Sequence, residues 1–225
     1  MKAMNTPRRG SRATTILWPG FLASRMRQTC RALGLMALWL LAPLAVADAF
    51  EDGVAAAQRG DYATAAKLWR PLADAGDARG QGALAMLYDN GQGVTKDYAA
   101  AFKWYRAAAE QELPQAQYGL GVMYEDGRGT VKDKAEAAKW YRRAANQRMA
   151  QAQYSLGLMY ARGEGIARDY LQAHLWLTLA LRSLNDEQAR ATVEKMRTLV
   201  ASKMSAPQVQ EAEQLAEAWT PQAAD

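Results

Sequence analysis

The apolar residues of this chain follow a helical period and, over a longer distance, a repeat of 36 residues. In residues 113–126, Gln117, Leu120, Gly121 and Tyr124 lie at positions i, i+3, i+4 and i+7, which form one stripe along an α-helix. A second helical stripe, through Ala137, Trp140, Tyr141 and Ala144, follows Asp133. The pattern therefore predicts pairs of amphipathic helices.

Aspartates mark the start of four similar segments at the 36-residue spacing. Leucine, tyrosine and two glycine positions recur at the same spacing in the first three units, and a fourth unit begins and then diverges. The recurring residues are Asp61, Asp97, Asp133 and Asp169, then Leu84, Leu120 and Leu156, Tyr88, Tyr124 and Tyr160, Gly91, Gly127 and Gly163, and Gly93, Gly129 and Gly165. Because one helix hairpin cannot bury its own apolar face, neighbouring units are expected to stack.

The helix ends are also readable from the sequence. Asp133 suits an N-cap, because its carboxylate accepts orphan amide hydrogens, and Glu136 has the spacing of a capping box with it. Gly127 can take the left-handed conformation that closes a helix, and we expect Gly129 to loosen the same turn.

The second helix of each unit carries small residues beside aromatic ones. The stripe of Ala101, Trp104, Tyr105 and Ala108 recurs as Ala137, Trp140, Tyr141 and Ala144. Small residues let helices approach closely while the rings fill the gaps. We interpret the aromatic residues Trp104, Tyr105, Tyr124, Trp140, Tyr141 and Tyr160 as structural.

These motifs resemble a known family. The Leu-Gly-x-x-Tyr core, the Gly-x-Gly turn, the Asp-Tyr opening and the Ala-x-x-Trp-Tyr-Arg segment are similar to Sel1-like repeats (SLR), which are relatives of the tetratricopeptide repeat. The resemblance implies an all-α protein, an α/α solenoid of tetratricopeptide-like helix hairpins with helical caps. We expect a capping helix over residues 48–60, about three repeats over residues 61–185, and capping helices with a tail over residues 186–225.

The first 47 residues have the pattern of a secretory signal. Residues 33–47 (LGLMALWLLAPLAVA) are uncharged and follow three arginines, and the run is short for a membrane-spanning helix. Small residues predict cleavage before Asp48 or before Phe50, and Met26 is a candidate for the true start. The twin arginines Arg8 and Arg9 are the weaker alternative, because the apolar run does not follow closely. We expect a periplasmic or secreted protein without stable membrane insertion after cleavage.

Charge excludes one class of partner. The net charge of +5 arises in the leader, which holds seven of the 28 basic residues and no acidic one, so the rest carries 21 basic against 23 acidic residues. A groove that tracks phosphate has no support from this composition, and we expect no nucleic-acid partner. The single cysteine, Cys30, precedes the apolar run, so packing and not disulfide bonds must stabilise the mature chain.

Candidate catalytic groups are few. His174 is the only histidine, which leaves zinc and iron without their usual ligands, and it is interpreted as a packing or surface residue. Ser155 lacks the glycine of a nucleophile elbow, and Glu125 and Asp126 diverge by about 100° on a helix. We expect no enzyme activity, no metal and no cofactor. The alternative is a hydrolase acting on β-lactams, since some SLR proteins have been linked to that activity, although their disulfide cysteines are missing here.

The resemblance places the first helix of each unit along a concave groove. Its outward stripe mixes tyrosines, apolar residues and both charge signs, which suits contact with another protein or peptide. The candidate partner-binding residues are Arg79, Met86, Asp89, Gln115, Tyr118, Val122, Glu125, Gln151, Tyr154, Leu158 and Arg162. We therefore predict an exported protein-interaction scaffold, with Tyr118 and Tyr154 as two anchors in one groove.

Overall fold

The computed structural model describes residues 49–221, and every regular element in this range is a helix. The predicted leader with Met26 and Cys30 lies outside the described residues. Residues 49–58 are helical, where a capping helix was expected. The helices that follow are α2 (Tyr62–Asp74), α3 (Ala78–Asn90), α4 (Tyr98–Ala109), α5 (Pro114–Asp126), α6 (Lys134–Asn146), α7 (Ala150–Arg162), α8 (Tyr170–Ser183), α9 (Glu187–Ala201) and α10 (Ala206–Ala218).

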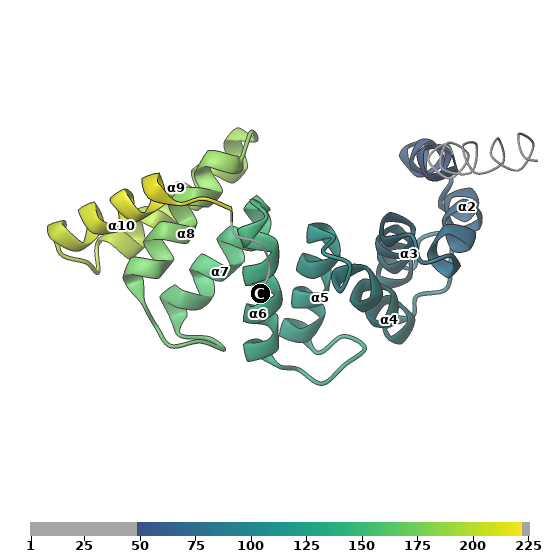
Figure 1. Ribbon diagram of the computed structural model, residues 1–225, viewed down its shortest axis with the longest axis horizontal. Helices are drawn as coiled ribbons and strands as arrows, with labels where there is room; N and C mark the ends of the chain where they lie inside the picture. The colour runs from purple at the N-terminus through teal and green to yellow at the C-terminus, as the bar shows by residue number, and fades with distance from the viewer. Residues whose placement is uncertain (1–48, 222–225) are drawn as a thin grey trace, which may run out of the picture. The chain divides into compact units, whose positions relative to one another are not determined.

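Helices α2 to α8 pack in chain order, each against the next (Figure 1). The tightest pairs are α3 with α4, α5 with α6 and α7 with α8. These pairs are the hairpins that the repeat pattern predicts. The all-α solenoid expected from the sequence is confirmed.

The aspartates at the repeat spacing cap the second helices as predicted. Asp97 Oδ1 accepts from the amides of Ala99 and Ala100, and Asp133 Oδ1 accepts from the amides of Ala135 and Glu136. Asp61 and Asp169 cap α2 and α8 in the same way.

The predicted capping box between Asp133 and Glu136 does not form. The amide of Asp133 donates instead to the carbonyl of Tyr124, and the Glu136 carboxylate accepts from Lys139. Both groups that the box requires are therefore already engaged. A capping box does occur at α10, where Ser205 pairs with Gln208.

The two glycines of each turn have different tasks. Gly127 ends α5 in the left-handed conformation, as expected. Gly129 also has a positive φ, of 68°, but it does more than loosen the turn, because a Cβ there would lie 2.1 Å from the carbonyl oxygen of Tyr98. Because glycine has no Cβ, the turn can pack directly against the backbone at the start of α4, the second helix of the preceding hairpin.

The core consists of small residues and leucines between the stacked helices. Leu84, Leu120 and Leu156 are completely buried, and so are most alanines of the second helices. Among the aromatic residues, Tyr141 is the most deeply buried, whereas Trp104 and Trp140 are half-buried. The structural role of the rings is thus strongest at Tyr141.

The repeated tyrosines were expected in the core but lie only half-buried. Their rings pack inside, as Phe102 does edge-on against Tyr124 at 5.3 Å. Their hydroxyl groups reach the surface, where Arg70 donates to Tyr88 and Arg142 to Tyr160. Tyr88 and Tyr160 therefore each connect their helix to an arginine of the preceding second helix.

A set of buried glutamines was not predicted as such. Gln81, Gln117 and Gln153 recur at the repeat spacing, and each donates its side-chain amide to a carbonyl at the end of the preceding helix, those of Ala73, Ala109 and Ala145. Gln117 belongs to the stripe that was predicted to face the stack, and its complete burial confirms this prediction. These amides satisfy helix ends that packing removes from water.

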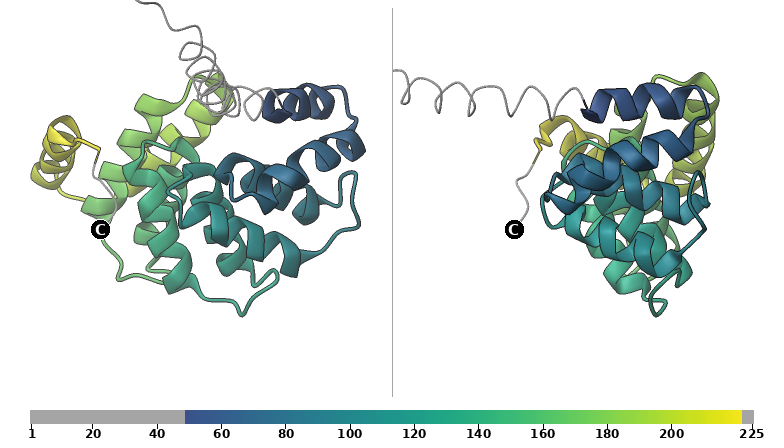
Figure 2. Two further views of the ribbon diagram at one scale, coloured as in Figure 1. Left: turned by 45° about the vertical axis from the view of Figure 1, so that its right-hand side comes forward. Right: turned by 90° about the vertical axis from the view of Figure 1, so that its right-hand side faces the viewer.

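The last two helices flank α8 instead of forming a further hairpin. Both α9 and α10 pack on α8, and Figure 2 shows this end of the protein from two further directions. Both lie within residues 186–225, where capping helices with a tail were expected. Among the described helices, none combines the length and apolar character needed to cross a membrane.

Candidate protein-binding groove

An apolar groove of about 790 Å³ lies between the N-terminal helix and the first helices of the next two hairpins. Residues 49–58, α3 and α5 supply most of its wall. The lining residues are Phe50, Val54, Ala57, Gln58, Tyr62, Trp69, Arg79, Gly82, Ala83, Met86, Tyr105, Leu113, Gln115, Ala116, Tyr118 and Met149. Four of the predicted contact residues, Arg79, Met86, Gln115 and Tyr118, therefore face one groove.

The edge formed by the N-terminal helix is fixed by Trp69. The indole nitrogen of Trp69 donates to the carbonyl of Phe50 at 3.1 Å, and the two rings pack at 6.0 Å. Gly53 makes this approach possible, because a Cβ there would lie 2.2 Å from Trp69 Nε1. The N-terminal helix is thereby attached to α2 as one wall of the groove.

Arg79 contributes the only charged side chain of the lining. Its guanidinium lies 4.6 Å from the centre of the Phe50 ring, a cation–π contact. Its nearest carboxylate, Asp77, is 3.5 Å away and already caps α3 by accepting from the amide of Gly80. Arg79 therefore keeps hydrogen-bond donors available at the mouth of the groove.

Tyr118 forms part of the opposite wall and is anchored from behind. Its ring packs on that of Tyr141 at 5.5 Å, and its hydroxyl is hydrogen-bonded to Ser155. Burial raises the pKa of the Tyr118 phenol, so it stays neutral as a donor and acceptor. The ring presents a rigid aromatic edge to the groove.

Small residues on α3 create the space. Gly82 stands at the repeat position that Tyr118 and Tyr154 occupy in the next two units, and Ala83 follows it. A Cβ at Gly82 would lie 2.9 Å from Leu113 Cδ2, so the floor is already closely packed. Because position 82 carries no aromatic ring, the space between the N-terminal helix and α5 is not filled.

Two of the predicted contact residues have structural partners. Asp89 pairs with Arg128 at 2.7 Å and is largely buried. Glu125 accepts a hydrogen bond of 2.7 Å from the hydroxyl of Tyr141, and burial together with this carboxylate raises the pKa of Tyr141. Asp89 thus connects two neighbouring hairpins, Glu125 connects the two helices of one hairpin, and neither lines the groove.

The other predicted residues lie elsewhere on the stack. Leu158 and Arg162 line a smaller hollow of about 270 Å³ with residues of α8 and α9. Val122 packs on the central core, and Gln151 is exposed. Tyr154 packs beside the α8 and α9 core, so the structure does not bring Tyr118 and Tyr154 together in one groove.

The groups considered for catalysis have structural surroundings. His174 is buried with its Nδ1 3.5 Å from the hydroxyl oxygen of Thr178, and burial together with Arg197 lowers its pKa. Asp126 forms an ion pair with Arg128 at 3.2 Å, whereas Glu125 accepts a hydrogen bond from Tyr141. The two adjacent carboxylates therefore have different partners. Residues 49–221 contain no cluster of histidine and acidic residues arranged to hold a metal.

The groove residues outside the two first helices were not predicted as contact residues. Phe50 and Val54 fall in the segment predicted as a capping helix, and no role was predicted for Met149. The available signal was the absence of an aromatic residue at Gly82. Only the packing of the N-terminal helix across that gap shows which residues enclose it.

Stacked hairpins with capped second helices and paired glycine turns define an α-helical repeat protein. The Sel1 repeat family model matches residues 35–77, 78–113, 114–148 and 150–183, which is well over half of the chain, so the chain belongs to this family. The family model matches four repeats, one more than the three that we expected from the motifs. Sel1 repeat proteins generally act as protein-interaction scaffolds and are mostly non-enzymatic.

Two solved structures support this assignment. A Sel1 repeat protein from Oxalobacter formigenes shares 33% identity over 60% of this chain and 56% of its own, with a TM-score of 0.58. A protective antigen present in uropathogenic Escherichia coli strains, displaying an SLR fold, shares 28% identity over 77% of this chain and 45% of its own, with a TM-score of 0.53. The chain thus spans about half the length of either protein. None of the curated proteins matches it.

Proposed function

We propose that this protein is an exported scaffold that binds a segment of a partner protein in the groove between the N-terminal helix, α3 and α5. The observation that carries the proposal is the lining, which is apolar and aromatic apart from Arg79 and a few amides. Rigid rings and an arginine around a desolvated hollow are typical of the anchor sites of protein interfaces.

The chemistry of the lining selects the partner. Apolar side chains of the partner would displace water from the space between Met86, Tyr105 and Tyr118. An aspartate or glutamate beside them would accept from the free donors of Arg79, whose side chain is 44% exposed. Because the lining contains no lysine and no second arginine, a phosphate backbone does not fit it.

A random peptide library displayed on phage tests this selectivity. We expect purified protein to enrich short peptides that combine apolar residues with one acidic residue. The variant Arg79→Glu should exchange the acidic preference for a basic one, whereas Lys67→Glu, the same change at an exposed position outside the groove, should leave it intact. A library that enriches nothing, or a preference that ignores the sign at position 79, would contradict the groove assignment.

Site-specific photocrosslinking identifies the physiological partner. A crosslinking amino acid at Met86 or Gln115 should capture the partner in cells, and one at the exposed Val131 should not. The captured protein is then titrated against Met86→Glu and the matched control Val131→Glu. We expect a loss of affinity of about thirtyfold or more for Met86→Glu alone, as for an anchor worth about 2 kcal/mol.

Export rests on the predicted leader over residues 1–47. Mass spectrometry of the protein from a periplasmic or culture fraction should find a mature chain that begins at Asp48 or Phe50. An intact leader in a membrane fraction would show instead that the apolar run is an anchor. The groove experiments remain valid in either case, because every residue that they alter lies after the leader.

A further inference from the structure

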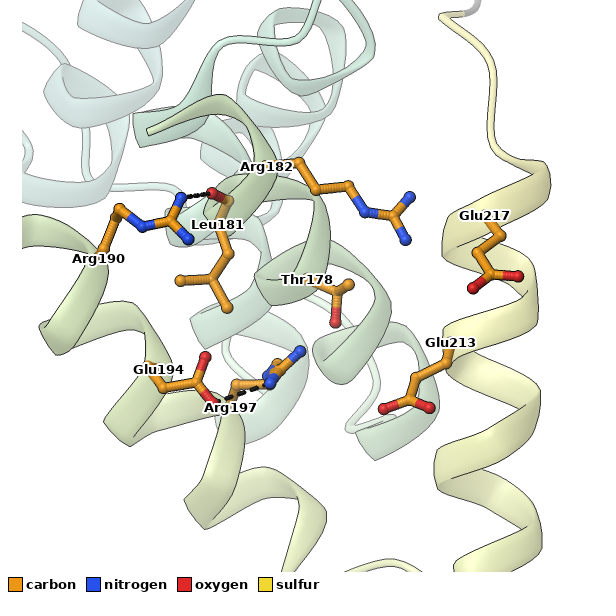
Figure 3. A pocket seen from close by; sticks show the side chains of 8 residues that line it. All are labelled: Thr178, Leu181, Arg182, Arg190, Glu194, Arg197, Glu213 and Glu217. Atoms are coloured by element: carbon orange, nitrogen blue, oxygen red, sulfur yellow. Dashed lines mark hydrogen bonds and ion pairs between the residues drawn. The ribbon is translucent and has the colours of Figure 1, made fainter. Parts of the chain in front are cut away.

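A second, charged cleft lies at the other end of the repeat stack, between α9 and α10 and above α8. It encloses about 360 Å³, and Figure 3 shows side chains from all three helices directed into it. The lining residues are Thr178, Leu181, Arg182, Arg190, Glu194, Arg197, Glu213 and Glu217. None of them belongs to the apolar groove.

The cleft has a buried floor and two charged walls. Thr178 and Leu181 of α8 form the floor and are 6% and 8% exposed. On α10, Glu213 and Glu217 are four residues apart and so share one face of the helix. They stand opposite the arginine side of the cleft (Figure 3).

The arginines are held in place by hydrogen bonds and an ion pair, of which only the bond of Arg182 reaches across to α10. Arg190 donates to the carbonyls of Leu181 and Leu184 at the end of α8. Arg197 pairs with Glu194 at 2.8 Å. Arg182 donates one hydrogen to a main-chain carbonyl of α10. These bonds fix the positions of the guanidinium groups.

Opposite charges face one another across the cleft without pairing. Between residues 49 and 221, no ion pair joins α10 to an arginine of α8 or α9. Arg182 and Arg197 each keep N–H groups unused, and no hydrogen bond within the described residues reaches the carboxylates of Glu213 and Glu217. The cleft thus offers free donors on one side and free acceptors on the other.

We propose that this cleft binds the head group of a free α-amino acid. The ligand's carboxylate accepts from Arg182 and Arg197, and its ammonium group donates to Glu213 and Glu217. A purely anionic ligand would meet the glutamates, and a purely cationic one would meet the arginines. Only a ligand with both charges a few bonds apart satisfies both walls.

Calorimetry on the purified protein with alanine as the probe tests the site, with ethylamine and propionate as its two halves. For so small a ligand in an open cleft we expect a Kd of about 1 mM. Each half alone should bind at least about tenfold more weakly. L- and D-alanine are compared to show whether the site distinguishes the hand of the amino acid, and a preference for either one supports the proposal.

The matched variants are Glu213→Gln with Glu217→Gln, against Glu211→Gln on the same exposed helix but outside the cleft. The double variant should weaken alanine binding at least about tenfold, and Glu211→Gln should not change it. Circular dichroism and the urea midpoint confirm that each variant is folded.

Two results would overturn the proposal. One is the absence of saturable alanine binding, or binding no tighter than that of the halves. The other is a stability loss specific to the double variant without any effect on ligand, which would mean that the walls pair with each other in solution. Neither outcome bears on the groove, since the two sites share no residue.

Discussion

The buried glutamines give the sharpest test of how the repeats are held together. Gln117 has a full set of partners, because its amide nitrogen donates to Ala109 and to Glu112 at 2.9 Å, and its oxygen accepts from Gln147 at 2.9 Å. Gln153 stands at the same position one repeat later and donates to Ala145, but its buried oxygen has no donor among the described residues. The reason is visible in the sequence, where Ser183 replaces the glutamine that would follow Gln111 and Gln147.

Replacing each glutamine by methionine keeps the side-chain length and removes the polar amide. For Gln117→Met, two neutral hydrogen bonds of about 1 kcal/mol each and one bond to a carboxylate of about 1.5 kcal/mol or more are lost. The added apolar burial returns about 1 kcal/mol. We expect a net loss of about 3 kcal/mol in the free energy of unfolding.

For Gln153→Met the same change removes one hydrogen bond of about 1 kcal/mol. It also removes a buried oxygen without a hydrogen-bond donor, which relieves a penalty of about 1 to 3 kcal/mol. The expected result is no loss, or a gain of up to about 2 kcal/mol. Urea unfolding followed by circular dichroism measures both variants, with the slope of the transition as a check on cooperativity. Equal destabilisation by the two substitutions would refute the pairing scheme.

Three further results are expected. Gly129→Ala should destabilise by about 3 kcal/mol, because its Cβ would collide with the backbone of Tyr98, whereas Gly60→Ala, with a positive φ and open space around it, should cost only about 1 kcal/mol in thermal unfolding. Burial lowers the pKa of His174 in the folded protein, so the unfolded chain takes up a proton first as the pH falls below about 6.5. The free energy of unfolding should therefore decrease between about pH 7 and pH 5 in the native protein. The variant His174→Phe should not show this decrease. Purified protein should not turn over nitrocefin, and turnover abolished by a single substitution would revive the β-lactam hydrolase alternative.

Much of the fold follows from local sequence. Asp97 and Asp133 cap helices through their own next three residues, and Gly127 ends a helix through its own backbone conformation. The helical stripe through Leu120 is set by a period of 3.6 residues. Such features depend on neighbours within one or two turns, so the sequence shows them directly and the repeat confirms them.

Other features depend on what another helix brings. Tyr118 and Tyr154 occupy the same repeat position, yet only Tyr118 lines the groove. Likewise, Glu125 was predicted to face a partner and instead accepts a hydrogen bond from Tyr141, because α6 crosses in front of it. Position along one helix does not decide these environments.

The sequence by itself determined the helices, their caps, their turns and the 36-residue stacking unit, because each of these is encoded within a short stretch of chain. The tertiary structure alone decided where a groove and a cleft open. The groove depends on the N-terminal helix spanning the gap that Gly82 leaves, and the cleft depends on α9 and α10 both packing on α8 with a space between them. Both sites are spaces between helices that are distant in sequence, and their walls exist only after those helices have packed.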